Sequence, residues 1–199
     1  GSLIKKKNIS IHRYYSSLQL RANNTLKIIQ KVLNDEKDFI KAWQINERHY
    51  RVLTGLNKNE MKEKFGEKKI HELRRSWNIK PGPLSKNSPY HPLNIGVYKE
   101  IPSEKIPDTE SLKDTYDRVV LYYKDEIYNK LSNNKNVLVA AHGNSIRALC
   151  KFLFKLDNKK ISSLEIPTGN PLLINFNSKI KIIECKYLDK YRAKNLLVF

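Results

Sequence analysis

The fold is decided by the stretch Val137-Leu138-Val139-Ala140-Ala141-His142-Gly143-Asn144-Ser145. Its first five residues are apolar and stop abruptly at a histidine, which predicts a strand buried on both faces. Asn144 is a residue type that begins helices, so a helix is expected to start near it. Ligands of open α/β sheets bind at such strand ends, and a helix N-terminus after a glycine suits an anion. From this stretch alone, His142 is explained as well by hydrogen bonding within the loop as by catalysis.

The composition predicts one globular domain spanning residues 1–199. Hydrophobic residues make up 40% of the chain and aromatic residues 10%, which is enough for a substantial core. The formal net charge of +18, from 38 Lys and Arg against 20 Asp and Glu, implies an anionic partner such as a phosphorylated metabolite, nucleic acid or an acidic surface. The lysines are scattered, however, so a solvated surface accounts for much of this excess.

Neither the cysteines nor the apolar segments suggest a metal site or a membrane protein. Cys150 and Cys185 do not have the spacing of metal ligands or of a redox motif, and we expect core thiols of a reducing compartment. We find no apolar stretch long enough to span a membrane and no ordered signal peptide at the start, so a cytoplasmic protein is expected. Residues 3–7 resemble the last turn of an amphipathic helix, as if the chain began within a fold.

Strands and helices are expected to alternate along the chain. The hydrophobic pattern predicts strands over residues 9–16 and 39–45, helices over 21–33, 57–65 and 111–131, a helical turn around 70–75, and a hairpin from 172–176 and 180–187. Ser111 and Asp114 form a predicted capping box. Residues 78–107 contain most of the prolines and predict either a lid or binding loop or a disordered insert. The alternation predicts an α/β sheet.

Chemically reactive side chains cluster after the second predicted strand. Glu47 beside Arg48 is either a surface ion pair or a carboxyl group held near a bound phosphate, where it keeps a proton for general acid catalysis. Lys58 follows closely in the sequence. Arg74 and Arg75 are adjacent at a predicted helix end, an arrangement that favours convergence of both guanidinium groups on one anion.

The order and spacing of several motifs resemble those of cofactor-dependent phosphoglycerate mutases, which belong to the histidine phosphatase superfamily. The resemblance covers nearly the whole chain. Its motifs are Asn46-Glu47-Arg48-His49-Tyr50 with Leu53-Thr54-Gly55-Leu56-Asn57-Lys58, then Arg74-Arg75-Ser76-Trp77-Asn78-Ile79, Thr109-Glu110-Ser111-Leu112-Lys113-Asp114-Thr115, Ala140-Ala141-His142-Gly143-Asn144-Ser145-Ile146-Arg147-Ala148-Leu149 and Ile166-Pro167-Thr168-Gly169.

The resemblance implies a three-layer α/β sandwich, with a mostly parallel mixed sheet and helices on both faces. It also implies interconversion of 3- and 2-phosphoglycerate in glycolysis through a phosphohistidine, with 2,3-bisphosphoglycerate as the priming phosphate donor and no metal. By motif, Glu47 is the acid and base, and His142 is the second histidine, flanked by the donors of Gly143 and Asn144. The resemblance assigns phosphate and substrate binding to Arg21, Arg48, Tyr50, Lys58, Arg74 and Arg75.

One motif of the family is missing from these residues. The family has an Arg-His-Gly at the end of its central first strand, and its histidine is the nucleophile; no such motif occurs in this sequence. Two explanations are open: an N-terminal segment precedes these residues, or the protein is a degenerate relative. We expect the first, because a sheet without that strand would leave residues 137–141 with an unpaired apolar edge.

Two further departures keep other functions open. Arg51-Val52 stands where the family usually has glycine and a small residue, and the tail after Tyr187 is short, which would admit water to a phosphoenzyme. A histidine-type phosphatase acting on small phosphorylated metabolites is therefore the alternative enzyme. A catalytically dead metabolite-binding relative is the alternative from another class. Nucleic acid is not an expected partner, since no recognition motif occurs, and a homo-oligomer is left open because the family often dimerises.

Overall fold

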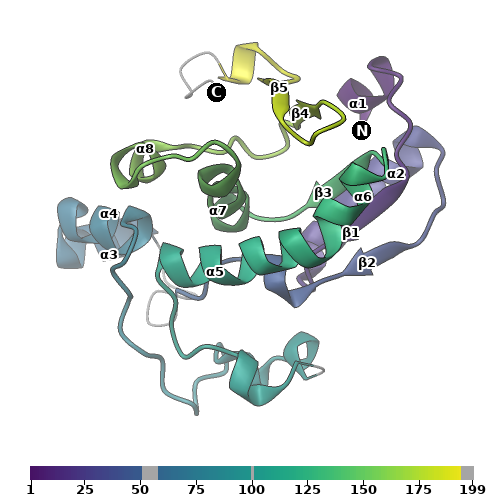
Figure 1. Cartoon of the computed structure of the whole chain (residues 1–199). Helices are drawn as coiled ribbons and strands as arrows, with labels where there is room; N and C mark the ends of the chain where they lie inside the picture. The colour runs from purple at the N-terminus through teal and green to yellow at the C-terminus, as the bar shows by residue number, and fades with distance from the viewer. Residues whose placement is uncertain (51–57, 100, 194–199) are drawn as a thin grey trace.

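The computed structural model describes residues 1–50, 58–99 and 101–193, and its core is a parallel sheet (Figure 1). Strands β1 (Arg13–Ser16), β2 (Phe39–Lys41) and β3 (Val137–Ala140) are ordered β2-β1-β3, with both pairs parallel. Strands β4 (Leu172–Phe176) and β5 (Ile182–Tyr187) form a separate antiparallel pair. The predicted α/β architecture is confirmed.

Helices cover both faces of the parallel sheet. Successive residues of a strand point to opposite faces, and Tyr14 packs with Leu26 of α2 (Leu20–Leu33) on one face. Tyr15 packs on the other face with Tyr122 at the end of α5 (Leu112–Tyr122) and with Ile127. In Figure 1 the long helix formed by α5 and α6 (Tyr128–Ser132) runs across this second face. The layers of the predicted sandwich are thus helix, sheet and helix.

Helix α7 (Gly143–Leu153) follows β3 directly and packs against α5. Its first turn is stabilised by the His142 main-chain N–H, which donates to Oγ of Ser145 over 3.0 Å. The predicted capping box of α5 is also present: Ser111 Oγ accepts from the N–H of Asp114, and the Ser111 N–H donates to the Asp114 carboxylate. Both helix starts therefore follow from local side-chain chemistry.

Some predicted elements differ from the observed ones. The second predicted strand ends at Lys41, because the chain turns into a 3-10 helix over Trp43–Ile45. Both faces of strand β3 are packed as predicted, with Val137 and Val139 against one core cluster and Leu138 and Ala140 in the other. Its first three residues are nevertheless only half-buried, and one of its edges has no partner among the described strands. The predicted helix over 111–131 contains a π-helical turn at Tyr123–Ile127.

The remaining elements are short and lie around this core. They are α1 (Ser2–Lys6), α3 (Lys58–Phe65), α4 (Glu67–Arg75), α8 (Asn158–Ser163) and 3-10 turns at Pro92–Asn94, Gly96–Tyr98, Ser103–Lys105 and Tyr191–Ala193. Apart from these turns, the described part of 78–107 is irregular, as predicted. No described helix is long and apolar enough to cross a membrane.

Candidate active site

The carboxyl ends of all three parallel strands lead into the candidate site. Ser17 and Arg21 follow β1, Glu47 follows β2, and His142 follows β3. Because parallel strands end at the same edge of a sheet, these side chains are brought to one place. Ser17 is fixed there by its main-chain N–H, which donates to the carbonyl of Ala140 over 3.3 Å.

His142 is buried and held at both ring nitrogens. Arg21 Nε donates to its Nδ1 over 3.0 Å, and its Nε2 lies 2.7 Å from Oγ of Ser17. Since Nδ1 accepts, the ring hydrogen lies on Nε2, which donates to Ser17. Burial lowers the pKa of His142 to about 3, and the charges of Arg21 and Arg118 contribute to this shift. The imidazole is therefore neutral at physiological pH.

Glu47 is connected to the His142 loop through Asn144. Its Oε1 accepts from Nδ2 of Asn144 at 3.0 Å and from the main-chain N–H groups of Asn144 and Arg48 at 3.3 and 2.8 Å. The NH₂ group of Asn144 also donates to the hydroxyl of Tyr50 over 2.6 Å. Arg147 donates to Oδ1 of Asn144 over 2.8 Å. The structure thus brings the predicted residues Glu47, Asn144 and Tyr50 together.

Arg48 is buried, and its guanidinium group holds the main chain together. Its Nε donates to the carbonyl of Glu110 over 2.7 Å. Its Nη1 donates to the carbonyl of Arg74 over 3.3 Å, and its Nη2 donates to the carbonyls of Leu73 and Ile79 over 3.0 Å. Burial lowers the pKa of Arg48. These bonds give it a positioning role, and its predicted role in substrate binding stays a prediction.

Arg74 and Arg75 point to different partners. The Arg74 guanidinium lies 4.8 Å from the ring centroid of Tyr50, whereas Arg75 donates to the carbonyl of Leu164 over 3.1 Å and pairs with Glu165. The expected convergence of both guanidinium groups on one point is not seen. Of the two arginines, only Arg74 makes a cation–π contact with the Tyr50 ring.

The two remaining predicted residues, Gly143 and Lys58, both begin helices. Gly143 begins α7, and a Cβ atom there would meet nothing within 4 Å, so the space beside it is open. Lys58 begins α3, but its side chain lies outside the described residues, as do Arg51 and Val52.

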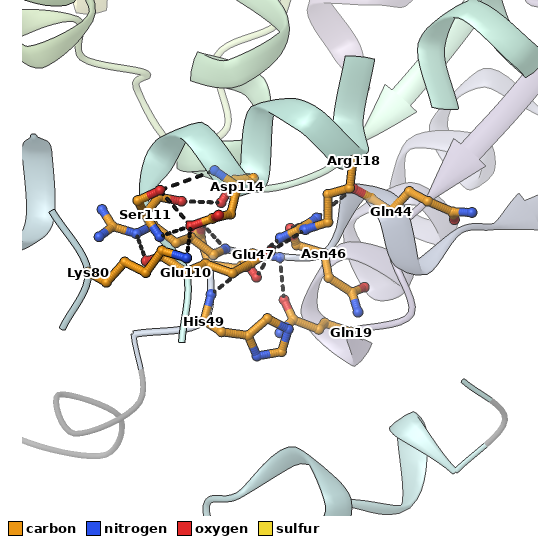
Figure 2. A network of polar contacts seen from close by, with 12 residues as sticks. Gln19, Gln44, Asn46, Glu47, His49, Lys80, Glu110, Ser111, Asp114 and Arg118 are labelled. Atoms are coloured by element: carbon orange, nitrogen blue, oxygen red, sulfur yellow. Dashed lines mark hydrogen bonds and ion pairs between the residues drawn. The ribbon is translucent and has the colours of Figure 1, made fainter. Parts of the chain in front are cut away.

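Sequence reasoning missed the buried ion pair of Glu110 and Arg118 (Figure 2). Arg118 Nε and Nη2 lie 2.7 and 2.9 Å from the two carboxylate oxygens of Glu110. Burial would raise the pKa of Glu110, but Arg118 and the N–H of His49 hold it below its ordinary value. Arg118 also donates to the carbonyls of Gln44, Asn46 and Glu47. The only sequence signal was the position of Glu110 inside a recognised motif.

A neutral histidine, a carboxyl group and several guanidinium groups at one sheet edge form a site suited to phosphate esters. The histidine can hydrogen-bond a phosphoryl group, the carboxyl group can exchange protons with a hydroxyl, and the cations can neutralise the ester's charge. Fold and site together define an α/β protein of the phosphate-handling class.

Comparison with known proteins narrows this class. Residues 2–91 and 89–185 match the model of the histidine phosphatase superfamily (branch 1). A 2,3-bisphosphoglycerate-dependent phosphoglycerate mutase of Pelagibacter ubique is 69% identical over 199 residues, which cover 100% of this chain and 84% of that protein. A protein of the same name from Borrelia garinii is 42% identical, over 99% of this chain and 80% of that protein.

The fold is shared with solved phosphatases. A mycobacterial glucosyl-3-phosphoglycerate phosphatase superposes with a TM-score of 0.62 at 15% identity, over 94% of this chain and 78% of that one. The α-ribazole phosphatase of Shigella flexneri gives a TM-score of 0.57 at 14% identity, over 89% and 74%. This chain belongs to the histidine phosphatase superfamily and, within it, to the family of 2,3-bisphosphoglycerate-dependent phosphoglycerate mutases.

Proposed function

We propose that this protein interconverts 3- and 2-phosphoglycerate through a phosphohistidine, with 2,3-bisphosphoglycerate as the priming donor. The observation that carries the proposal is the hydrogen bonding of residues 142–144, where His142 contacts Arg21 and Asn144 holds Glu47. The named mutases, up to 69% identical, support it. Within this proposal the enzyme acts in the cytoplasm, in glycolysis, on small anionic phosphate esters.

The donor set fits a ligand with several negative charges. Arg21 would hold a phosphoryl group beside His142, and Arg74 with the Tyr50 hydroxyl would hold the carboxylate or the second phosphate. We assign Lys58 to the same binding role. Bound 2,3-bisphosphoglycerate would supply the phosphoryl group that primes the enzyme. Neutralising and orienting such groups is most of what phosphoryl transfer requires.

His142 and Glu47 have separate tasks in this proposal. The neutral His142 donates from Nε2 to Ser17 Oγ, and in this proposal an oxygen of the transferring phosphoryl group takes the place of Ser17 as the acceptor. Glu47 takes a proton from the attacking hydroxyl of the phosphoglycerate and returns one to the leaving oxygen. Its carboxylate is oriented for this by the Asn144 and Arg48 N–H groups. The nucleophile is assigned by the family resemblance to the Arg-His-Gly motif, which these residues do not contain.

The proposal is tested with the full-length protein. It is expected to convert 3-phosphoglycerate to 2-phosphoglycerate only when primed with 2,3-bisphosphoglycerate, and to acquire an acid-labile, base-stable label from the ³²P-labelled donor. Glu47→Gln should lower kcat at least about 100-fold while changing the Kd of 3-phosphoglycerate little. The matched control Glu36→Gln changes an exposed carboxylate and should leave kcat unchanged.

Two results would contradict the proposal. Absence of both isomerisation and labelling would favour a metabolite-binding relative. Release of inorganic phosphate from 3-phosphoglycerate faster than its isomerisation would favour the phosphatase.

A further inference from the structure

Gln19 joins segments of the chain that meet in the site but are far apart in the sequence. It lies between β1 and α2, and its Oε1 accepts from Arg21 Nη2 at 3.0 Å and from the main-chain N–H of Glu47 at 3.3 Å. Its Nε2 donates to the hydroxyl of Tyr98 over 2.9 Å. Figure 2 shows Gln19 beside Glu47, with the contact drawn between them. The Gln19 side-chain amide thus contacts Arg21, the main chain of Glu47, and Tyr98 from the 78–107 region.

Tyr98 anchors the cover segment, which we define as residues 78–99 and 101–107. Although this segment is irregular and much of its surface is exposed, the Tyr98 side chain is only 5% exposed. Its ring packs against His49, with centroids 5.6 Å apart, and its hydroxyl reaches Gln19. The cover segment is therefore attached to the site through a buried side chain that the family motifs did not include.

The Gln19 amide has one satisfactory orientation. Two N–H donors face Oε1, and a rotated amide would set its NH₂ group against both of them. The fixed oxygen in turn orients Arg21, whose Nε donates to His142 and whose Nη2 donates to Gln19, so that the guanidinium plane is held. Nη1 has no hydrogen-bond partner among the described residues, and in the proposed function it would bind a phosphate.

We propose that Gln19 is a positioning residue that couples the docking of Tyr98 to the orientation of Arg21 and of the Glu47 main chain. The site is then arranged for its phosphorylated ligand only when the cover segment is docked. The ligand part of this inference rests on the proposed function; the coupling itself rests on the contacts described above.

The first test uses Gln19→Leu, Tyr98→Phe and the double variant in the full-length protein. Calorimetry should show the Kd of 3-phosphoglycerate raised about tenfold by Gln19→Leu, because Arg21 and the Glu47 N–H lose their acceptor, and about threefold by Tyr98→Phe. Both changes break the same connection, so the double variant should bind no more weakly than Gln19→Leu alone. The control Tyr90→Phe removes a hydroxyl from an exposed tyrosine of the same segment and should change nothing.

A second measurement needs neither ligand nor activity. The Arg21 Nε–H signal in ¹⁵N NMR, assigned by its loss in Arg21→Lys, should exchange faster with solvent in both single variants than in the unmodified protein and in Tyr90→Phe. Effects on Kd that add in the double variant, or an Arg21 signal that stays unchanged, would overturn the inference. A protein that neither binds nor isomerises 3-phosphoglycerate but shows the Arg21 changes would overturn the proposed function and leave the coupling supported.

Discussion

Arg21 donates a hydrogen bond from Nε to Nδ1 of His142 over 3.0 Å. A guanidinium group has no lone pair to offer, so this contact requires an unprotonated Nδ1. If the ring took up a second proton, two positive charges would face each other in a buried place. The pair therefore keeps the imidazole neutral and its Nε2–H directed at Ser17.

The neutral state of His142 can be checked by NMR. Burial is the largest cause of its lowered pKa of about 3, and Arg21 is the next. We therefore expect the ring signals of His142 to stay constant from pH 8 to about pH 5. In Arg21→Met the pKa should rise, but it should stay below 6.5 because the ring remains buried. Titration of His142 near pH 6.5 in the unmodified protein would show that the ring is not held as described.

The same histidine should make the protein sensitive to acid. The unfolded chain binds a proton at His142 below about pH 6.5, whereas the folded chain does not until about pH 3, so stability falls as the pH drops between these values. The slope from this residue approaches about 1.4 kcal/mol per pH unit. In urea unfolding at pH 7, 6, 5 and 4, His142→Gln should lose less stability across the series than the unmodified protein. If the free energy of unfolding fell equally with pH in both proteins, this prediction would be wrong.

Breaking the buried pair of Glu110 and Arg118 should be costly. Their side chains are 2% and 10% exposed, and Glu110→Gln would leave the Arg118 charge unpaired in the interior. We expect a loss of about 3–5 kcal/mol in the free energy of unfolding. Asp117→Asn is the matched control, because Asp117 pairs with Lys113 at the surface, where such pairs contribute little. Equal losses in both variants, measured by urea unfolding, would contradict this expectation.

Features that depend on neighbouring residues could be predicted from the sequence. The apolar run of 137–140 and its abrupt end at His142 predicted β3 and the start of α7, and Ser111 with Asp114 predicted the cap of α5. These signals are local, because strand pattern and helix capping involve residues only a few positions apart. That Glu47 and His142 belong to one site was implied only by the family resemblance; the structure brings them to one sheet edge because its strands are parallel.

Features that depend on distant contacts could not be predicted. Arg48 bonds to the carbonyl of Glu110, 62 positions away, and Arg75 to that of Leu164, 89 positions away. Nothing in an arginine's own neighbourhood tells whether it will meet an anion or a main-chain carbonyl. Gln19 was missed for the same reason, since two of its partners come from segments 28 and 79 positions away.

The hydroxyl and the ring of Tyr50 are expected to contribute separately to the kinetic constants. The hydroxyl accepts from Nδ2 of Asn144, while the guanidinium groups of Arg48 and Arg74 lie 5.0 and 4.8 Å from the ring centroid. Tyr50→Phe keeps the ring and should lower kcat/KM about threefold to tenfold. Tyr50→Leu also removes the cation–π contacts and should raise KM further. Indistinguishable KM values for the two variants would show that the ring does not position Arg74.

Replacing Arg147 tests whether the orientation of the Asn144 side chain matters for catalysis or only for folding. It is 2% exposed, and burial, reinforced by Arg75, lowers its pKa to about 10, so its charge is expensive to keep in the interior. Although the carbonyls of Arg75 and Ile161 lose a donor in Arg147→Met, the variant fills the same space and removes the cost of keeping a buried charge. Asn144 would nevertheless lose the donor at Oδ1 that directs its NH₂ group to Glu47 and Tyr50.

We expect Arg147→Met to lower kcat about tenfold or more and to lower the free energy of unfolding by about 1–3 kcal/mol, because removal of the buried charge offsets part of the lost hydrogen bonding. The control Arg13→Met removes an exposed arginine of β1 and should leave kcat unchanged. Steady-state kinetics and urea unfolding of the same preparations give both quantities. A large loss of stability with unchanged kcat in the folded fraction would make Arg147 a structural residue only, whereas a selective loss of kcat shows that the alignment of Glu47 depends on the Arg147–Asn144 contact.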